Sequence, residues 1–140
     1  MPSDPAVRLL RSEQLSPGVP YAYAATTEAP PRLVFTAGAC PLDAEGRTVA
    51  VGDVAGQAEQ VMANLRAALQ TAGADLTDVL ITHVYVASSS RDDLSTAWDV
   101  VRRHFGDHDA PGTLLGVTVL GWPDQLVEVE AVAVARISGD

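Results

Sequence analysis

The sequence predicts an α+β fold in which six strands and two helices follow one another in the order βββαβαββ. Two stretches carry this prediction. The pattern of residues 110–136 predicts two strands joined by a loop. In the second strand, alternation puts valine and alanine residues on one face, and two glutamates followed by two valines on the other. Upstream, apolar residues recur at helical spacing from Val54 to Ala72 through Ala58, Val61, Leu65 and Ala68, which indicates one face of an amphipathic helix. No linker or repeat interrupts the pattern, so residues 1–140 are expected to form a single domain.

The first third of the chain predicts three strands. Residues 7–10 form a short edge strand. Residues 21–26 and 32–36 are expected to pair as a hairpin, and the connection at Pro30–Pro31 is expected to be stiff because proline fixes the backbone φ angle.

Helices and strands then alternate. Asp53 is placed to cap the first helix and Gly73 to end it. A second helix begins at a capping box in residues 90–93 and closes at Gly106. Between them, strand 79–87 is apolar on both sides and is expected to be central. Strict alternation puts Val79, Ile81, Tyr85 and Ala87 on one face and Leu80, Val84 and Val86 on the other.

Two helices are too few to cover both faces of a six-stranded mixed sheet, and they are expected on one face only. Strands 79–87 and 126–136 nevertheless carry apolar residues on both faces. Apolar patches of that size are rarely left to water. The sequence therefore predicts a homo-oligomer in which the uncovered faces of neighbouring subunits pack together.

Composition excludes several classes of function. A net charge of -9, with scattered basic residues, has the wrong sign for binding a nucleic acid backbone. No apolar run approaches the roughly 18 residues of a membrane span. Residues 1–5 have neither a basic start nor an apolar core, so no secretory signal is expected. The single cysteine, Cys40, leaves no intrachain disulfide, and the cytoplasm is the expected compartment.

Glu128 and Glu130 are the first candidates for chemistry. They lie on one face of an otherwise apolar strand, where an ionised carboxylate without a partner loses several kcal/mol of solvation. Polar groups must therefore meet them. The pair fits a general acid and base, but two carboxylates at this spacing are also common in solvated or salt-bridged settings, which the spacing alone favours.

Other candidates have simpler interpretations. His83, His104 and His108 form no short ligand motif, so no metal is expected. Cys40 reads as a small buried thiol and not as a nucleophile. Trp98, at helical spacing, reads as a core or subunit contact. No phosphate-binding or dinucleotide-binding motif is present, and no cofactor is expected.

Several segments occur in a characteristic order: Leu33-Val34-Phe35-Thr36-Ala37-Gly38 with Pro41-Leu42-Asp43, then Gly52-Asp53 with Gln57, Asn64-Leu65 and Ala72-Gly73-Ala74, and finally Val127-Glu128-Val129-Glu130-Ala131. In this order they resemble the Rid family, also called YjgF-type or endoribonuclease L-PSP-type proteins. The resemblance covers nearly the whole chain. It implies a chorismate-mutase-like α+β subunit and a homotrimer whose ligand clefts lie between subunits.

The resemblance also implies an activity, the hydrolysis of reactive enamines and imines to 2-oxo acids and ammonia. Glu128 matches a glutamate that helps place the water, and Tyr21 matches a tyrosine lining the cleft. The family's arginine, which clamps the substrate carboxylate, falls on Gly112 or Thr113, and no arginine occurs from residue 104 to 135. Trp98 stands where many members carry asparagine.

Two classes of function follow. The first is an enzyme of an arginine-less Rid branch, a hydrolase of a neutral or cationic imine, enamine or related small metabolite, with Glu128 orienting water and Tyr21 positioning substrate. The second is a non-catalytic ligand-binding or regulatory trimer. The family's ribonuclease label is a third possibility, and the net charge counts against it.

Overall fold

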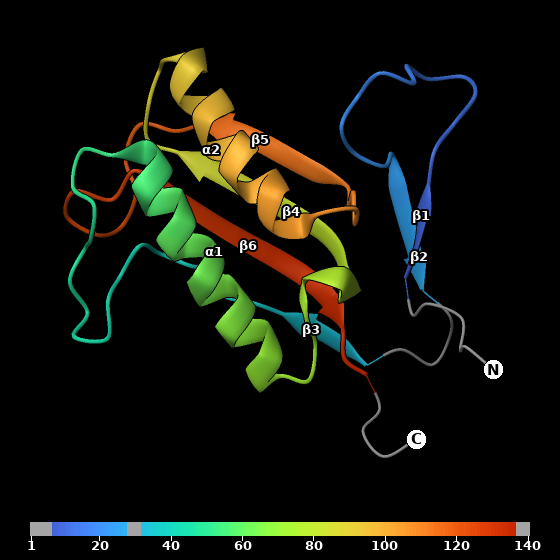
Figure 1. Ribbon diagram of the computed structural model, residues 1–140, viewed down its shortest axis with the longest axis horizontal. Coiled ribbons are helices and arrows are strands. Elements are labelled where there is room, and N and C mark those ends of the chain that lie inside the picture. The colour runs from blue at the N-terminus through green and yellow to red at the C-terminus, as the bar shows by residue number, and fades with distance from the viewer. Residues whose placement is uncertain (1–6, 28–31, 137–140) are drawn as a thin grey trace.

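The computed structural model describes residues 7–27 and 32–136 and confirms the α+β class, with two long helices and a mixed sheet (Figure 1). The element order follows βββαβαββ with one added 3-10 turn, η1. The strands are β1 (Val7–Leu10), β2 (Ala24–Thr27), β3 (Leu33–Phe35), β4 (Val79–Val86), β5 (Gly112–Gly116) and β6 (Val127–Val134). The helical elements are α1 (Val54–Thr71), η1 (Leu76–Asp78) and α2 (Arg91–Phe105).

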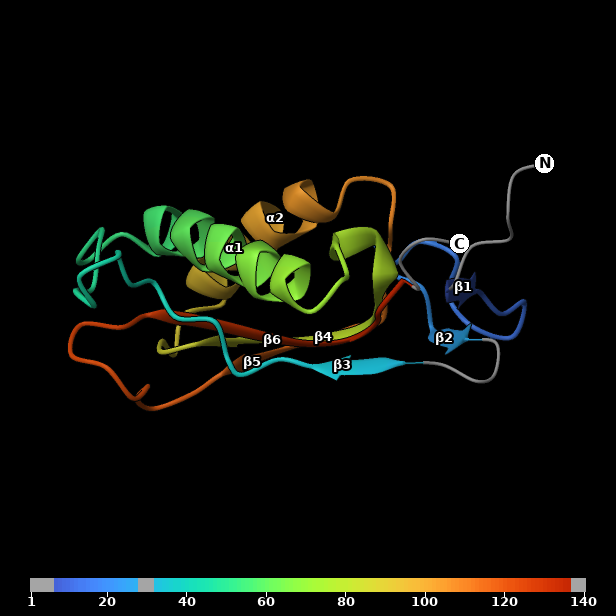
Figure 2. The same cartoon turned by 90° about the horizontal axis from the view of Figure 1, so that it is seen from below.

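The main sheet has four strands in the order β3-β6-β4-β5. Strands β4 and β5 are parallel, as the helical crossover α2 between them allows, and the other two pairings are antiparallel. Both long helices lie on one face of this sheet, and no helix among the described residues lies on the opposite face, here called the open face (Figure 2). Among the described residues, no helix has the length and hydropathy needed to cross a bilayer.

The prediction of one six-stranded sheet is wrong for the described residues. Strands β1 and β2 form a separate antiparallel pair, and β3 pairs with β6. The predicted hairpin between the second and third strands is therefore also wrong. Pro30 and Pro31, which lie outside the described residues, have no N–H group to donate to a ladder, which disfavours a hairpin that continues through them.

Strand β4 contains a β-bulge that corrects its predicted faces. Val79 pairs with Ala133 and Ile81 with Val132, so Leu80 is an extra residue. Val79 therefore faces the helices, and Ile81, two residues on, faces the open side. The helix-facing set of β4 is Val79, Thr82, Val84 and Val86, all buried.

The core lies between the helices and the sheet. Five apolar residues of α1 are fully buried: Ala58, Val61, Met62, Leu65 and Leu69. Ala68 and Ala72, which the apolar spacing placed on this face, are exposed. The larger Met62 and Leu69 take the buried positions, because burial stabilises roughly in proportion to apolar area.

Helix termini follow the prediction in part. The Asp53 side chain accepts a hydrogen bond from the Gly56 backbone at the start of α1, as expected. The capping box predicted at the start of α2 is wrong, because the Ser90 side chain makes no cap hydrogen bond. Instead the Ser88 hydroxyl donates to Asp93 and accepts from the Ser90 backbone N–H.

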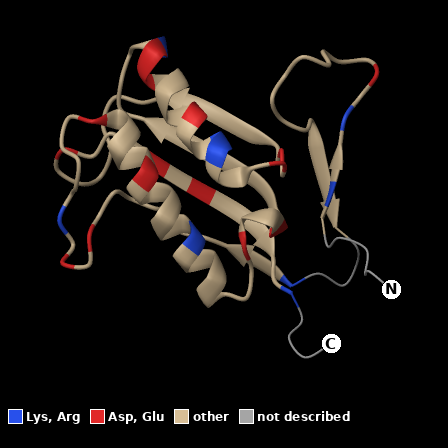
Figure 3. Cartoon of the chain, viewed as in Figure 1, with Lys and Arg blue, Asp and Glu red and all other residues tan. Residues whose placement is uncertain are grey.

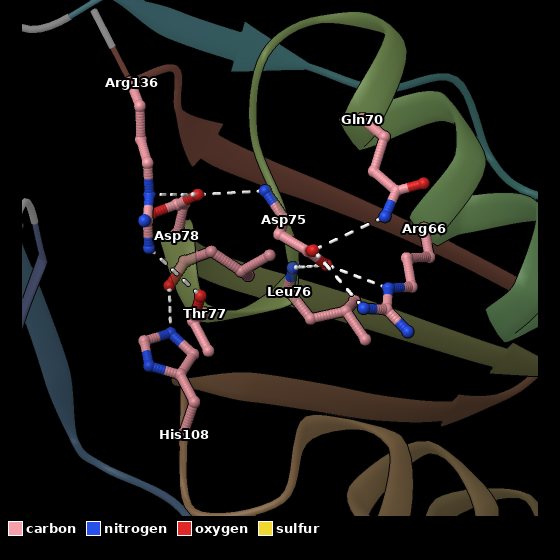
Figure 4. Close-up of polar contacts among 9 residues, drawn as sticks. Arg66, Gln70, Asp75, Leu76, Thr77, Asp78, His108 and Arg136 are labelled. Carbon is pink, nitrogen blue, oxygen red and sulfur yellow. Dashed lines mark hydrogen bonds and ion pairs between the residues drawn. The ribbon is translucent and has the colours of Figure 1, made fainter. Parts of the chain in front are cut away.

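A polar cluster around η1 ties the end of β6 to the start of β4 (Figure 4). Asp78 is 2% exposed and accepts from the Asp75 backbone and from Nε of Arg136, which lies 3.0 and 3.2 Å from its two carboxylate oxygens. Asp75 in turn accepts from Arg66. This end of the sheet is thus fixed by an ion pair with one buried partner.

Gln57 anchors two loops at the other end of α1. Its fully buried amide donates to the carbonyls of Ala50 and Asp124 and accepts, at 2.7 Å, from the Leu126 backbone N–H. One side chain therefore satisfies three backbone groups of irregular chain, which have no ladder partner of their own.

We expect Gln57→Leu to lower the free energy of unfolding by about 2–4 kcal/mol, because the Leu126 N–H and the Asp124 carbonyl lose their partner at a fully buried position. Gln60→Leu is the matched control on the same helix, since the Gln60 side chain bonds to Asn64 and to no other residue in the described part of the chain, and it is expected to cost less than about 1 kcal/mol. Urea unfolding of the two variants checks this, and equal losses would contradict the anchoring role of Gln57.

Candidate functional site

The two glutamates of β6 lie on the open face. Their neighbours Val127 and Val129 are fully buried under the helices, so alternation points Glu128 and Glu130 the other way. Across the ladder, Glu128 faces Tyr85 and Glu130 faces His83. Figure 3 shows the pair as acidic bands in a strand that is otherwise uncharged.

The Glu128 carboxylate is held on one oxygen. Cys40 Sγ donates to Oε1 at 3.1 Å, and Gln125 Nε2 donates to the same atom at 3.2 Å. Gly38 borders the other side, where a Cβ would lie 2.6 Å from Cδ and 2.7 Å from Oε2 of Glu128. A side chain at position 38 would displace the carboxylate, so Gly38 lets Glu128 lie between the backbone and two donors.

Asn64 of α1 positions the segment that carries Cys40. Its Nδ2 donates to the carbonyls of Cys40 and Leu42 at 2.8 and 3.0 Å. Ala39 forms a bridge with Val129 of β6, which sets the same segment beside Glu128. Gln125 is placed from the other side, because Gln57 binds the backbone on both sides of it.

Cys40 is a thiol and not a thiolate in this environment. Burial first, then the hydrogen bond to Glu128 and its charge, raise the pKa of Cys40 to about 11. A thiol with such a pKa donates a hydrogen bond and is a poor nucleophile. Cys40 is half-buried, and its role is that of a partner of Glu128.

Glu130 has its own partners on the open face. The Tyr85 hydroxyl donates to Oε1 at 2.7 Å, and His83 Nδ1 lies 3.6 Å from the same oxygen. The hydrogen bond to Glu130 raises the pKa of Tyr85, with burial and the charges of both glutamates adding to the effect. The expectation that polar groups meet the glutamates is confirmed.

Tyr21, Trp98 and Gly112 meet elsewhere, at a place here called the aromatic corner. The ring of Tyr21 stands edge-on to Trp98, with centroids 6.3 Å apart and planes at 89°. Gly112 opens β5 under the same indole, since a Cβ on it would lie 2.9 Å from Trp98 Cη2. Trp98 is half-buried, so this part of the corner is accessible.

The chain does not bring Glu128 to the aromatic corner. Gly112 pairs with Thr82 and Glu128 with Tyr85, on opposite sides of β4. The two positions are therefore on the order of 10 Å apart across the sheet and again on the order of 10 Å along it. Thr113 pairs with His83 and shares the open face with Glu128, whereas Gly112 contacts the helix side.

Sequence reasoning missed the partners of Glu128, namely Gly38, Cys40 and Gln125. Gly38 lies in one of the segments that resemble the family, but the sequence predicts no role for it, and it predicts no partner for Cys40. No local sequence pattern pairs residues that are so far apart in the chain. His83, Tyr85 and Glu130 form a cluster only through the register of β4. Within residues 7–27 and 32–136, no group of three His, Cys, Asp or Glu side chains is arranged to hold a metal.

Comparisons with known proteins agree with this architecture. The family model described as endoribonuclease L-PSP matches residues 12–135. The 2-iminobutanoate/2-iminopropanoate deaminase of Salmonella typhimurium is 33% identical over 106 residues, which cover 74% of this chain and 80% of the relative.

Solved structures are similar over almost the whole chain. The Rid-family protein YyfB of Yersinia pestis matches with a TM-score of 0.83 and 30% identity, covering 92% of this chain and 98% of that one. TdcF of E. coli, solved with bound serine, matches with a TM-score of 0.65 and 27% identity, covering 92% and 100%. From its matched family model, its relatives and its fold, the chain belongs to the Rid family, also known as the YjgF or endoribonuclease L-PSP family.

Proposed function

We propose that this protein is a homotrimeric hydrolase that binds a small imine, enamine or related metabolite in clefts between its subunits, with Glu128 orienting and deprotonating water. The observation that carries the proposal is the fixed carboxylate of Glu128 on a sheet face that no helix covers. Relatives named as deaminases support the reaction class.

The open face supports assembly. Its apolar side chains are exposed in the single chain, and Phe35 of β3 is 71% exposed. Leu33 and Leu115 are each 47% exposed at opposite edges of the same sheet. Apolar groups spread across a whole sheet face favour a second protein surface over water.

Assembly also supports a composite cleft. Glu128 and the aromatic corner are too far apart in one chain to touch the same small molecule. A neighbouring subunit seated on the open face is the arrangement that sets its Tyr21, Trp98, Gly112 or Thr113 opposite Glu128. The trimer is therefore part of the proposed site and not only a means of covering apolar area.

The chemistry needs one base and no covalent intermediate. The chain contains no lysine, so its own side chains supply no Schiff base. Water adds to the carbon of a C=N bond while Glu128 accepts one water proton and passes it to nitrogen, which gives the neutral carbinolamine. Transfer of the remaining hydroxyl proton to nitrogen, again through Glu128, breaks the C–N bond and releases C=O and ammonia. Cys40 and Gln125 occupy Oε1, which leaves Oε2 to accept the proton.

The absence of arginine from residue 104 to 135 directs the proposal away from 2-imino acids. At the position where the family resemblance predicts an arginine that binds the substrate carboxylate, this chain has Gly112 or Thr113. This favours a neutral or cationic substrate. The same absence favours the second candidate, a trimer that binds a ligand without turning it over. The serine bound by TdcF is a precedent for small polar ligands in a related protein.

We expect light scattering at micromolar concentration to give three times the 14.6 kDa chain mass. Phe35→Glu should yield smaller species, because it places a charge on the open face where another subunit is proposed to pack. Ala67→Glu, on the exposed side of α1, is the control and should stay trimeric. A stable wild-type monomer would contradict both the trimer and the composite cleft.

A second expectation concerns 2-iminopropanoate made in situ by an amino-acid oxidase. The protein should accelerate its hydrolysis hardly at all, since losing a charge-assisted contact to the carboxylate costs about 1.5–3 kcal/mol, or about 10–150-fold. The measurement is ammonia or pyruvate release with and without the trimer. Robust acceleration would mean that a cation from elsewhere binds the carboxylate.

Glu128→Gln tests the contact between Glu128 and Cys40. Burial is the largest cause of the raised pKa of Cys40, and the amide removes the two further causes, which are the hydrogen bond to the carboxylate and its negative charge. More thiolate is then present at pH 8–9, and alkylation by iodoacetamide should become several-fold faster. Cys40→Ser is the blank for labelling. An unchanged rate would contradict a contribution of Glu128 to the raised pKa of Cys40.

The same variant separates catalysis from structure. If Glu128 is the base, Glu128→Gln keeps the trimer and nearly unchanged stability but loses turnover of an accepted imine or enamine. If its role is structural, the variant costs about 1–3 kcal/mol of stability instead. Thermal unfolding beside the activity assay distinguishes these outcomes.

A further inference from the structure

Gly112 is a glycine because Trp98 lies against it. A Cβ at this position would lie 2.9 Å from Cη2 and 3.3 Å from Cζ3 of Trp98, and 3.3 Å from Cγ2 of Thr82. Gly112 is not among the residues with positive φ, so the close contact, and not a turn, accounts for it. No side chain can project from position 112 while the indole keeps its place.

The segment before β2 completes the aromatic corner. The ring of Tyr21 meets the indole edge-on, and Tyr23 meets Tyr21 in the same way at 5.9 Å and 82°. The backbone N–H of Ala22 donates to the Asp109 carbonyl at 2.7 Å, which holds the segment in place. Among the described residues, the Tyr21 hydroxyl has no hydrogen-bond partner, so it is available to a ligand.

The arginines described near the corner are paired or exposed. Arg11 donates to Asp109 at 2.9 Å and to the Val19 carbonyl. Arg102, one helical turn after Trp98, lines a small depression beside the indole but is itself exposed. An exposed cation is screened by water and salt and holds a carboxylate weakly.

We infer that Trp98 and Gly112 form a matched pair that determines which class of ligand binds at the aromatic corner. A flat, uncharged group packs on Trp98 and hydrogen-bonds to Tyr21, and a carboxylate of the same shape is rejected. The inference rests on the proposed function, because it uses the cleft assigned there. The reason is desolvation, since a carboxylate placed against the indole loses water without gaining a buried cation.

Benzamide and benzoate test this selection, because they share a planar shape and differ in charge. Isothermal titration of the wild-type trimer should give at least about tenfold tighter binding of benzamide. Trp98→Ala should remove this preference, whereas Arg102→Gln should leave it intact. Equal or tighter binding of benzoate overturns the inference, and so does no binding of benzamide at millimolar concentration.

A second measurement needs no ligand. Gly112→Ala should lower the melting temperature by several degrees in the wild type and by much less in the Trp98→Ala background, because the added methyl group then meets no ring. Equal shifts in both backgrounds would overturn the matched pair. Neither readout depends on Glu128, so a failure here is distinct from an inactive Glu128→Gln or a monomeric wild type, which test the proposed function.

Discussion

The structure depends on the pairing of β6 with both β3 and β4. Hydrogen bonds on both edges hold the strand so firmly that its alternation cannot slip, because a shift of one residue would carry both glutamates under the helices. Burial of Val127, Val129, Ala131 and Ala133 therefore also sets the direction of Glu128 and Glu130. The core and the candidate site are two faces of one strand.

Two amide side chains of α1 extend this control to the loops. Gln57 and Asn64 point from one helix to the backbone of different irregular segments, and these segments carry the two donors to Glu128. A helix that packs on the sheet thus also fixes the surroundings of a carboxylate on the far side of it. Loop positions set by buried amides are as well defined as those in regular structure.

The fold was largely predictable from sequence, because the signals are local. The periodicity of α1, its cap at Asp53 and the alternation of β6 each depend on neighbouring residues, and the structure has all three. Glu128 and Trp98 could be singled out by residue type and family resemblance. Two contacts could not be predicted, that of Cys40 with Glu128 and that of Trp98 with Gly112. Each joins residues that are distant in the chain, and no local sequence pattern encodes their packing.

The bulge at Leu80 joins two parts of β4 in which odd-numbered residues face opposite sides of the sheet. Upstream of it, Val79 faces the helices; downstream, the same parity is reversed, so His83 and Tyr85 reach the open face. Deleting Leu80 would leave Val79 and Ile81 adjacent, opposite Ala133 and Val132, and regular alternation would keep both on their present faces. An insertion or deletion between Ile81 and Val86 has a different effect, because in the part of the strand beyond it core residues would exchange places with residues of the candidate site.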